Sequence, residues 1–281
     1  MYMVIGLQRP EYVSAPCRYN KVEKEAGAII IVDVFFPAPM FSGESHGLRK
    51  GSLKGDEDMK TNKINRIGIV GSGHIGGNLG ILLAKAGYEV LYSSRHPDTL
   101  KDLVRTSGPR ACAGTVAEAI AFGDVIVLSL PLKAVPELDA KAKEALKGKI
   151  VIDTSNPYPE RDGKIAEEAR KDPGGMGVFV ARLLPGARIV RAFNTVYFED
   201  LKRTTNKGGE KIGIPIAGDD QEGLKVAGEL VERAGLDPVV VGSLSTSKLF
   251  DVGTAVYATS APASEIRKKL NLKPAGSRRA A

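Results

Sequence analysis

Short apolar runs alternate along most of the chain with stretches in which apolar residues recur every three or four positions. The first example is the run from Arg66 to Val70, which predicts a buried strand. Residues 75–86 follow it with helical spacing and end at Gly87, a residue type common just after a helix. Continuous apolar strands joined by helices are typical of a parallel sheet covered on both faces.

The same alternation continues to the end of the chain. The predicted strands are residues 66–70, 88–93, 124–130, 149–153, 188–193, 212–217 and 238–242. The predicted helices are residues 75–86, 97–104, 116–122, 135–146, 178–184 and 221–234, with a helix or loop over 246–270. This order predicts an α/β protein with a Rossmann-type doubly wound, mostly parallel sheet and a small C-terminal α/β extension.

The first part of the chain differs from the rest. Residues 1–58 lack a sustained apolar period, whereas Met59 stands just before the strong strand pattern like a natural chain start. We therefore predict that residues 1–58 are a disordered or dispensable extension, or an artefact of start-site choice. The remaining predicted units are a dinucleotide-binding domain over 59–197, a small α/β unit over 198–270 and a mobile tail over 271–281.

Three glycines stand where the first strand hands over to the first helix. In this G-x-G-x-x-G, Gly71 permits a tight turn, Gly73 lets a pyrophosphate approach the backbone, and Gly76 lets helix and strand pack closely. The helix N-terminus then offers free N–H groups to the anion. A glycine-rich turn without a ligand is the alternative. The predicted loop consists of Gly71, Ser72, Gly73, His74, Ile75 and Gly76.

The end of the second strand indicates which dinucleotide binds. An NAD site usually has a carboxylate here for the ribose hydroxyls, but this chain has Ser94, Arg95 and His96. Ser94 can donate to a 2′-phosphate, and Arg95 can pair with it or stack on adenine. These residues favour NADP, although an arginine at a strand end can also be simply solvated.

Composition excludes several classes of partner. The formal net charge of +7 suits an anionic small ligand, and no basic run is interleaved with aromatics as nucleic-acid binding would require. The two cysteines have no metal-ligand spacing and fit a reducing, cytoplasmic setting. The longest apolar run, residues 28–41, is too short and interrupted to span a membrane. We expect no metal, nucleic-acid or membrane partner.

Several segments together resemble a known family. GSGHIGGNLG, SSRHP, GDVIVLSLP, DTSNPYPERDG, ARIVRAFNTV and IAGDDQEG, spread over about residues 64–270, are similar to the NADP oxidoreductases dependent on coenzyme F420. That group also includes the cytoplasmic reductase domain of the metalloreductases. The resemblance implies a hydride passed between the nicotinamide of NADP(H) and the isoalloxazine-like ring of coenzyme F420 or a flavin. It also implies a homodimer.

The resemblance further implies a nicotinamide pocket at the ends of later strands. In the alternative interpretation, Asn156 and Asn194 only cap loops. Arg161 could attract an anionic substrate tail, or it could be solvated beside its acidic neighbours. No histidine, lysine or tyrosine stands out as a general acid or base, so no catalytic side chain is predicted. The implied pocket residues are Leu130, Pro131, Ser155, Asn156, Pro157, Asn194 and Thr195.

Other interpretations use the same glycine fingerprint. The acceptor could be another small molecule such as a ferric chelate or quinone, or the chain could be a non-catalytic NADP-binding redox sensor. The β-hydroxyacid and 6-phosphogluconate dehydrogenases carry a large helical second domain, for which the residues after Asn194 are too few. Pyrroline-carboxylate and imine reductases have a helical dimerisation domain, which the predicted strands at 212–217 and 238–242 argue against.

Overall fold

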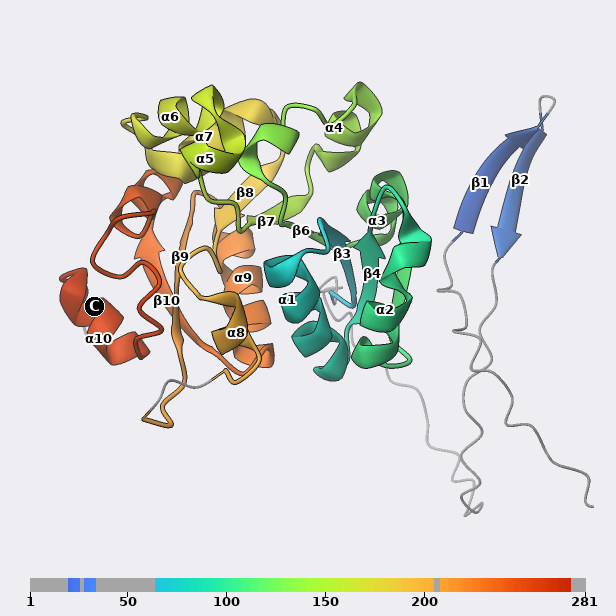
Figure 1. The fold of residues 1–281 in the computed structure, drawn as a ribbon. Helices are drawn as coiled ribbons and strands as arrows, with labels where there is room; N and C mark the ends of the chain where they lie inside the picture. The colour runs from blue at the N-terminus through green and yellow to red at the C-terminus, as the bar shows by residue number, and fades with distance from the viewer. Residues whose placement is uncertain (1–19, 26–27, 34–63, 205–207, 274–281) are drawn as a thin grey trace, which may run out of the picture.

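The computed structural model describes residues 20–25, 28–33, 64–204 and 208–273, and an eight-stranded sheet with helices on both faces dominates it (Figure 1). The strand order is β10-β9-β8-β7-β6-β3-β4-β5. The strands are β3 (Arg66–Val70), β4 (Glu89–Ser93), β5 (Ala111–Gly114), β6 (Val125–Leu128), β7 (Ile150–Asp153), β8 (Arg188–Arg191), β9 (Gly213–Gly218) and β10 (Asp237–Gly242).

Helices connect most of these strands. The α-helices are α1 (His74–Lys85), α2 (Lys101–Ser107), α3 (Val116–Phe122), α4 (Ala140–Leu146), α5 (Pro159–Asp162), α6 (Lys164–Arg170), α7 (Gly175–Leu183), α8 (Phe198–Leu201), α9 (Gln221–Arg233) and α10 (Ala263–Lys269). The 3₁₀ turns are η1 (Pro97–Leu100), η2 (Leu132–Ala134) and η3 (Leu244–Leu249).

The sheet has Rossmann topology with an antiparallel addition. The six neighbouring strands β5, β4, β3, β6, β7 and β8 pair in parallel. From β3 the chain adds β4 and β5 on one side, and it then crosses to the other side of β3 to add β6, β7 and β8. Such a switch point is where open α/β sheets bind ligands. β9 is antiparallel to β8, and β10 is parallel to β9, so the C-terminal unit extends the same sheet. The predicted fold class is confirmed.

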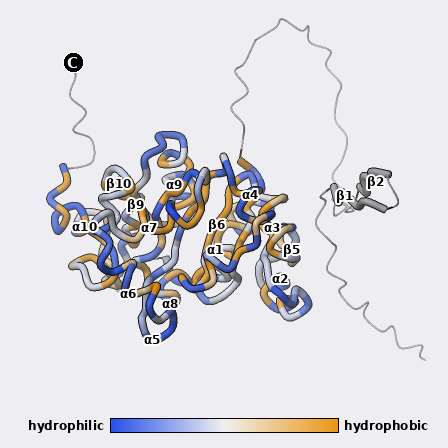
Figure 2. Tube along the Cα trace, turned by 90° about the horizontal axis from the view of Figure 1, so that it is seen from above, coloured by the Kyte–Doolittle hydropathy of each residue, from blue (hydrophilic) through white to orange (hydrophobic). Residues whose placement is uncertain are grey.

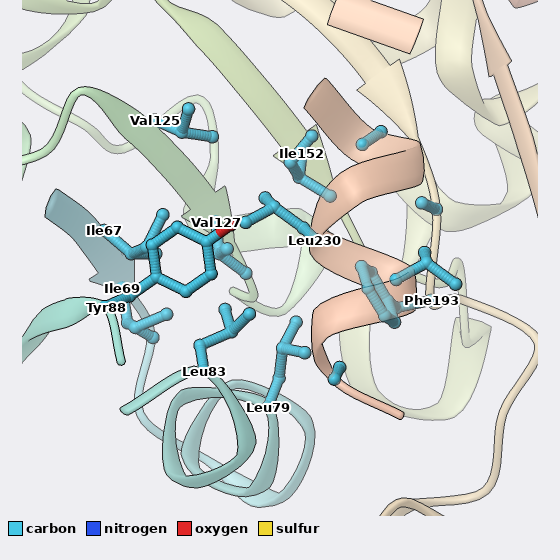
Figure 3. Packing of buried hydrophobic residues seen from close by; sticks show 14 of the residues in the cluster. Ile67, Ile69, Leu79, Leu83, Tyr88, Val125, Val127, Ile152, Phe193 and Leu230 are labelled. Carbon is cyan, nitrogen blue, oxygen red and sulfur yellow. The ribbon is translucent and has the colours of Figure 1, made fainter. Parts of the chain in front are cut away.

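Side chains of the central strands alternate between two cores. Ile67 and Ile69 of β3 point to one face, where they meet Leu79 and Leu83 of α1 and Leu230 of α9 (Figure 3). The other face packs against α3 and α7 around residues such as Val70, Ile126 and Val151. Burial on both faces explains why the strands read as continuous apolar runs. Viewed from above, β6 is strongly hydrophobic and the turn of α5 is hydrophilic (Figure 2).

Several local elements differ from the sequence prediction. Edge strand β5 was not predicted, because its four residues are small and form no long apolar run. The predicted helix over 135–146 is shorter, because α4 begins only after Asp139, whose side chain accepts from the Ala142 N–H at 2.7 Å. Helices α5 and α6 also occupy a segment for which no helix was predicted.

The N-terminal segment contains one described feature. β1 (Asn20–Glu25) and β2 (Ala28–Asp33) form an antiparallel pair, and the rest of residues 1–58 lies outside the described residues. The predictions for this segment and for most of the tail over 271–281 therefore stay predictions. Across the described part of the chain, no helix has the length and apolarity needed to cross a bilayer.

Candidate functional site

The glycine turn between β3 and α1 is shaped by two steric constraints. Gly71 has φ of +100°, and a Cβ placed on it would lie 2.5 Å from the Ser129 carbonyl oxygen. A Cβ on Gly76 would lie 2.1 Å from the Gly71 carbonyl oxygen. By contrast, a Cβ on Gly73 would meet nothing within 4 Å. The fold therefore requires glycine at 71 and 76, whereas Gly73 borders open space.

Helix α1 begins at this open space without a side-chain cap. Gly73 is its N-cap, no side chain hydrogen-bonds to its first turn, and no acidic residue lies there. The first N–H groups of a helix have no partner within the helix, and together with the helix dipole they favour an anion. His74 is exposed at this end and Ile75 packs partly into the core.

The end of β4 is tied to the glycine turn. The Gly71 N–H donates to Ser93 Oγ at 3.3 Å, and Ser72 Oγ donates to the Ser93 carbonyl at 3.0 Å. Ser94 Oγ accepts from the His96 N–H at 3.0 Å. Arg95 is exposed and forms no hydrogen bond or ion pair with any residue that the structure describes. Its guanidinium is free to meet a phosphate close to the turn.

The β6 end borders the same turn. The Ser129 N–H donates to the Val70 carbonyl at 2.8 Å, and the Leu130 side chain lies against Gly71. Leu130 and Pro131 are both half-buried. These residues supply an apolar wall beside the glycine turn.

The structure also brings together the residues expected at the ends of β7 and β8. Asn156 Nδ2 donates to the Asn194 carbonyl at 2.9 Å, and Asn194 Nδ2 donates to the Phe250 carbonyl at 3.0 Å. Asn194 is only 2% exposed, yet its Oδ1 has no hydrogen-bond partner among the described residues. A buried acceptor without a partner is costly, and a ligand donor would satisfy it. The Thr195 carbonyl is already used, because it accepts from the Ala258 N–H.

The remaining predicted residues of the β7 loop are engaged within the protein. Ser155 Oγ donates to Asp153 Oδ1 at 2.6 Å, and the Pro157 carbonyl accepts from Arg170 Nε at 2.9 Å. Both Ser155 and Pro157 are buried. These two residues fix the conformation of the loop, and Asn156, which lies between them in sequence, is half-buried.

A buried charge that sequence reasoning missed lies under this loop. Arg191 is fully buried, and its Nη1 donates to Asp153 Oδ2 at 2.6 Å and to the Ser155 carbonyl at 2.7 Å. Its Nε and Nη2 donate to Asp251 Oδ1 at 3.0 and 2.9 Å. Burial alone lowers the pKa of Arg191, but the charges of Asp153 and Asp251 outweigh it and raise the pKa above its ordinary value. Arg191 thus joins β7, β8 and the C-terminal segment.

Arg161 is held in place by its neighbours. Its Nη2 donates to the Asn156 carbonyl and to Asp162 Oδ2, both at 2.7 Å, and its guanidinium lies 5.0 Å from the Tyr158 ring centroid. Burial would raise the pKa of Asp162, but the hydrogen bonds and charge of Arg161 lower it overall. The Tyr158 hydroxyl in turn meets that of Tyr257, whose pKa is raised by burial and by this contact.

The candidate site therefore follows the carboxyl ends of five parallel strands, on both sides of the switch point between β3 and β6. One end offers backbone donors and a free arginine to an anion. The other offers a buried amide oxygen beside an apolar wall. The described residues contain no group of three or more histidine, cysteine, aspartate or glutamate side chains suited to a metal ion.

Known proteins share sequence with the part of the chain that carries these residues. Residues 66–157 match the family model described as NADP oxidoreductase, coenzyme F420-dependent. The F420-dependent NADP reductase of Methanothermobacter marburgensis is 28% identical over 192 residues, which cover 64% of this chain and 85% of that protein. Metalloreductase STEAP3 of Rattus norvegicus is 27% identical over 186 residues, covering 65% of this chain and about a third, 35%, of the metalloreductase.

Solved structures share the fold. A hypothetical protein, SMa0349, from Sinorhizobium meliloti superposes with a TM-score of 0.59 at 25% identity, covering 71% of this chain and 95% of its own. A putative F420-dependent NADP reductase from Arthrobacter sp. FB24 gives a TM-score of 0.55 at 21% identity, covering 66% and 88%. Residues 66–157, which carry the glycine turn and the ends of β4, β6 and β7, are thus the part of the chain that is similar to the NADP oxidoreductase, coenzyme F420-dependent, family.

Proposed function

We propose that this protein is an NADP(H)-dependent oxidoreductase that transfers a hydride between NADP(H) and a deazaflavin or flavin-like ring. The observation that carries the proposal is the buried, unpartnered Asn194 Oδ1, which stands at the same sheet edge as the open turn at Gly73. A dinucleotide laid along this edge would satisfy both features. The family match to NADP oxidoreductases supports the same ligand.

At one end of the site, backbone N–H groups and one cationic side chain would bind the phosphates of NADP(H). The open turn at Gly73 and the uncapped start of α1 suit a pyrophosphate, and Arg95 with Ser94 suits a 2′-phosphate. Since Arg95 has no partner among the described residues, pairing with phosphate breaks no existing ion pair. This end selects NADP over NAD.

The nicotinamide end would orient the reacting ring. Leu130 and Pro131 would pack against it, and Asn194 Oδ1 would accept from its carboxamide N–H₂. When bound, NADPH supplies the hydride, so the protein needs only to hold the ring at stacking distance and exclude water. Arg191 contributes by holding the Ser155 carbonyl and, through Asp251, the segment that carries Phe250.

Two alternative functions use the same site. Similarity to a protein named as a metalloreductase makes a ferric chelate the second candidate acceptor, with a small quinone beside it. A redox sensor that binds NADPH without turnover is the other alternative. A homodimer remains part of the proposal, and sedimentation of the purified chain would test it.

The experiment is an acceptor screen with the purified full-length chain. Loss of NADPH absorbance is followed with coenzyme F420, FMN, FAD, ferric chelates and small quinones, each at matched concentration. We expect rapid oxidation with F420 or a flavin and slow or no oxidation with the others. Turnover with ferric chelates alone would favour the metalloreductase alternative, and tight NADPH binding with no turnover would favour the sensor.

A further inference from the structure

A cluster of three aromatic side chains lies beside the start of α1. The rings of His74 and Phe198 stack with centroids 4.4 Å apart, and the rings of Tyr197 and Phe198 are tilted with centroids 4.6 Å apart. His74 belongs to the glycine turn, whereas Tyr197 and Phe198 follow the end of β8. We name these three side chains the aromatic ledge.

The ledge is fixed to the fold. Helix α8 packs against α1, as Figure 1 shows, and Asn78 Nδ2 of α1 donates to the Phe198 carbonyl at 3.0 Å. Leu201 anchors the same short helix because its side chain is fully buried. The Tyr197 carbonyl accepts from the Asp200 N–H at 2.9 Å, which starts the helix. The exposed tyrosine therefore stands on an ordered platform.

Tyr197 is exposed in an unusual place. Three large hydrophobic side chains of the described residues are prominently exposed: Tyr197 at 49%, Val240 at 47% and Leu249 at 43%. Val240 lies on the outer strand β10 and Leu249 at the end of η3, whereas Tyr197 lies three residues after Asn194 and its unpartnered oxygen. A rigid aromatic ring beside a ligand-binding edge is typical of a stacking surface.

We propose that the aromatic ledge binds the planar conjugated ring of the acceptor, with Tyr197 stacked on it. This inference rests on the proposed function. A hydride passes between two rings only at about 3–3.5 Å, and one face of the acceptor is then turned to the nicotinamide. The other face and the ring edge need an apolar partner, which the ledge provides. A ferric chelate would make little use of such a surface.

Charge and electron balance agree with this placement. The hydride leaves NADPH with both bonding electrons, so NADPH is oxidised to NADP⁺, and the acceptor ring is reduced and takes one proton from water. The reduced ring is richer in electrons than the oxidised ring. Lys202 Nζ lies 5.9 Å from the Phe198 ring centroid and places positive charge at the ledge, which favours that product.

The test compares Tyr197→Ser with Tyr197→Phe and with Val240→Ser, a matched control that removes exposed hydrophobic surface on the edge strand β10. Binding of F420, FMN and FAD to the full-length chain is measured by quenching of their fluorescence, and NADPH binding is measured separately. We expect Tyr197→Ser to weaken ring binding, and to raise KM for the ring, by about tenfold or more. NADPH affinity should stay within about twofold. Tyr197→Phe and Val240→Ser should bind like the wild type.

Each contrary result has a distinct meaning. Unchanged ring binding in Tyr197→Ser would overturn the ledge while turnover of F420 by the wild type still upheld the proposed function. A matching loss of NADPH affinity would also overturn it, because the ledge would then stack on the nicotinamide. If the wild type binds a ring without reducing it, the proposed function fails, yet loss of binding in Tyr197→Ser still supports the ledge. Absence of ring binding by the wild type would overturn the ledge directly.

Discussion

The two ends of the candidate site are built in different ways. At the proposed phosphate end, the glycine turn and Arg95 come from one stretch of chain, residues 71–95, and the start of α1 has no side-chain cap. At the nicotinamide end, a fully buried arginine joins residues that are distant in sequence: Arg191 binds Asp153, 38 positions away, and Asp251, 60 positions away. The proposed anion site thus depends on a short local segment, whereas the proposed ring position depends on long-range packing.

This difference leads to different sensitivities. Substitutions at the phosphate end should alter NADPH affinity. They should leave the fold intact at positions where the new side chain meets no neighbouring atom. Changes in the Arg191 network should first alter stability, because they leave charges buried without a partner.

The largest effect is expected for Arg191→Met, which leaves the Asp153 carboxylate buried and unpaired. We expect the free energy of unfolding to fall by about 3–5 kcal/mol, measured by chemical denaturation. Arg191→Lys keeps the charge but not the forked hydrogen bonds, so its free energy of unfolding should fall by less than that of Arg191→Met. The control is Arg105→Met, which breaks an exposed pair with Asp102 and should cause no measurable change. Equal stability of Arg191→Met and the control would contradict the assigned network.

The next prediction compares two glycines of the same turn. Gly76→Ala forces a Cβ to within 2.1 Å of the Gly71 carbonyl oxygen, so it should destabilise the fold by about 2 kcal/mol or more. Gly73→Ala meets no atom within 4 Å, and its stability should stay within about 1 kcal/mol of the wild type. Its NADPH affinity should nevertheless fall by about tenfold, because the methyl group enters the ligand space. Thermal unfolding and NADPH titration of both variants would measure this contrast. Unimpaired NADPH binding by Gly73→Ala would rule out the proposed pyrophosphate position.

A smaller effect is expected at Asn194. The 3-acetylpyridine analogue of NADP has a methyl group in place of the carboxamide nitrogen and cannot donate to Asn194 Oδ1. We expect it to bind the wild type more weakly than NADP by about 1–2 kcal/mol, measured by calorimetry. In Asn194→Leu the difference between the two ligands should shrink, because the acceptor is gone. An undiminished difference in that variant would assign the discrimination to another residue.

Local features were the predictable part of this molecule. Strand β3, the turn at Gly71 and helix α1 follow from adjacent residues, and their bounds agree with the prediction within one residue. Edge strand β5 was missed because its stability comes from pairing with β4 rather than from its own apolar residues. The family resemblance, and not periodicity, predicted that Asn156 and Asn194 lie together, and the structure joins them by a hydrogen bond.

The missed residues depend on contacts that no local pattern encodes. Arg191 interrupts an apolar run, a sign of a buried ion pair, but its partner Asp251 lies in a segment for which only a helix or loop was predicted. Tyr197 reads like any apolar residue in a strand-to-helix connection, and only its exposure beside Asn194 distinguishes it. Both depend on how the C-terminal segments pack onto the ends of β7 and β8.

The most direct test of the account measures the dissociation constants of NADPH and NADH for the wild type and Arg95→Ala. If the phosphate end selects NADP through Arg95, the variant should lose NADPH affinity by about tenfold or more, as expected for loss of a charge-assisted pair, and keep its NADH affinity. Equal loss for both cofactors, or no loss for either, would contradict the assignment of the 2′-phosphate to Arg95.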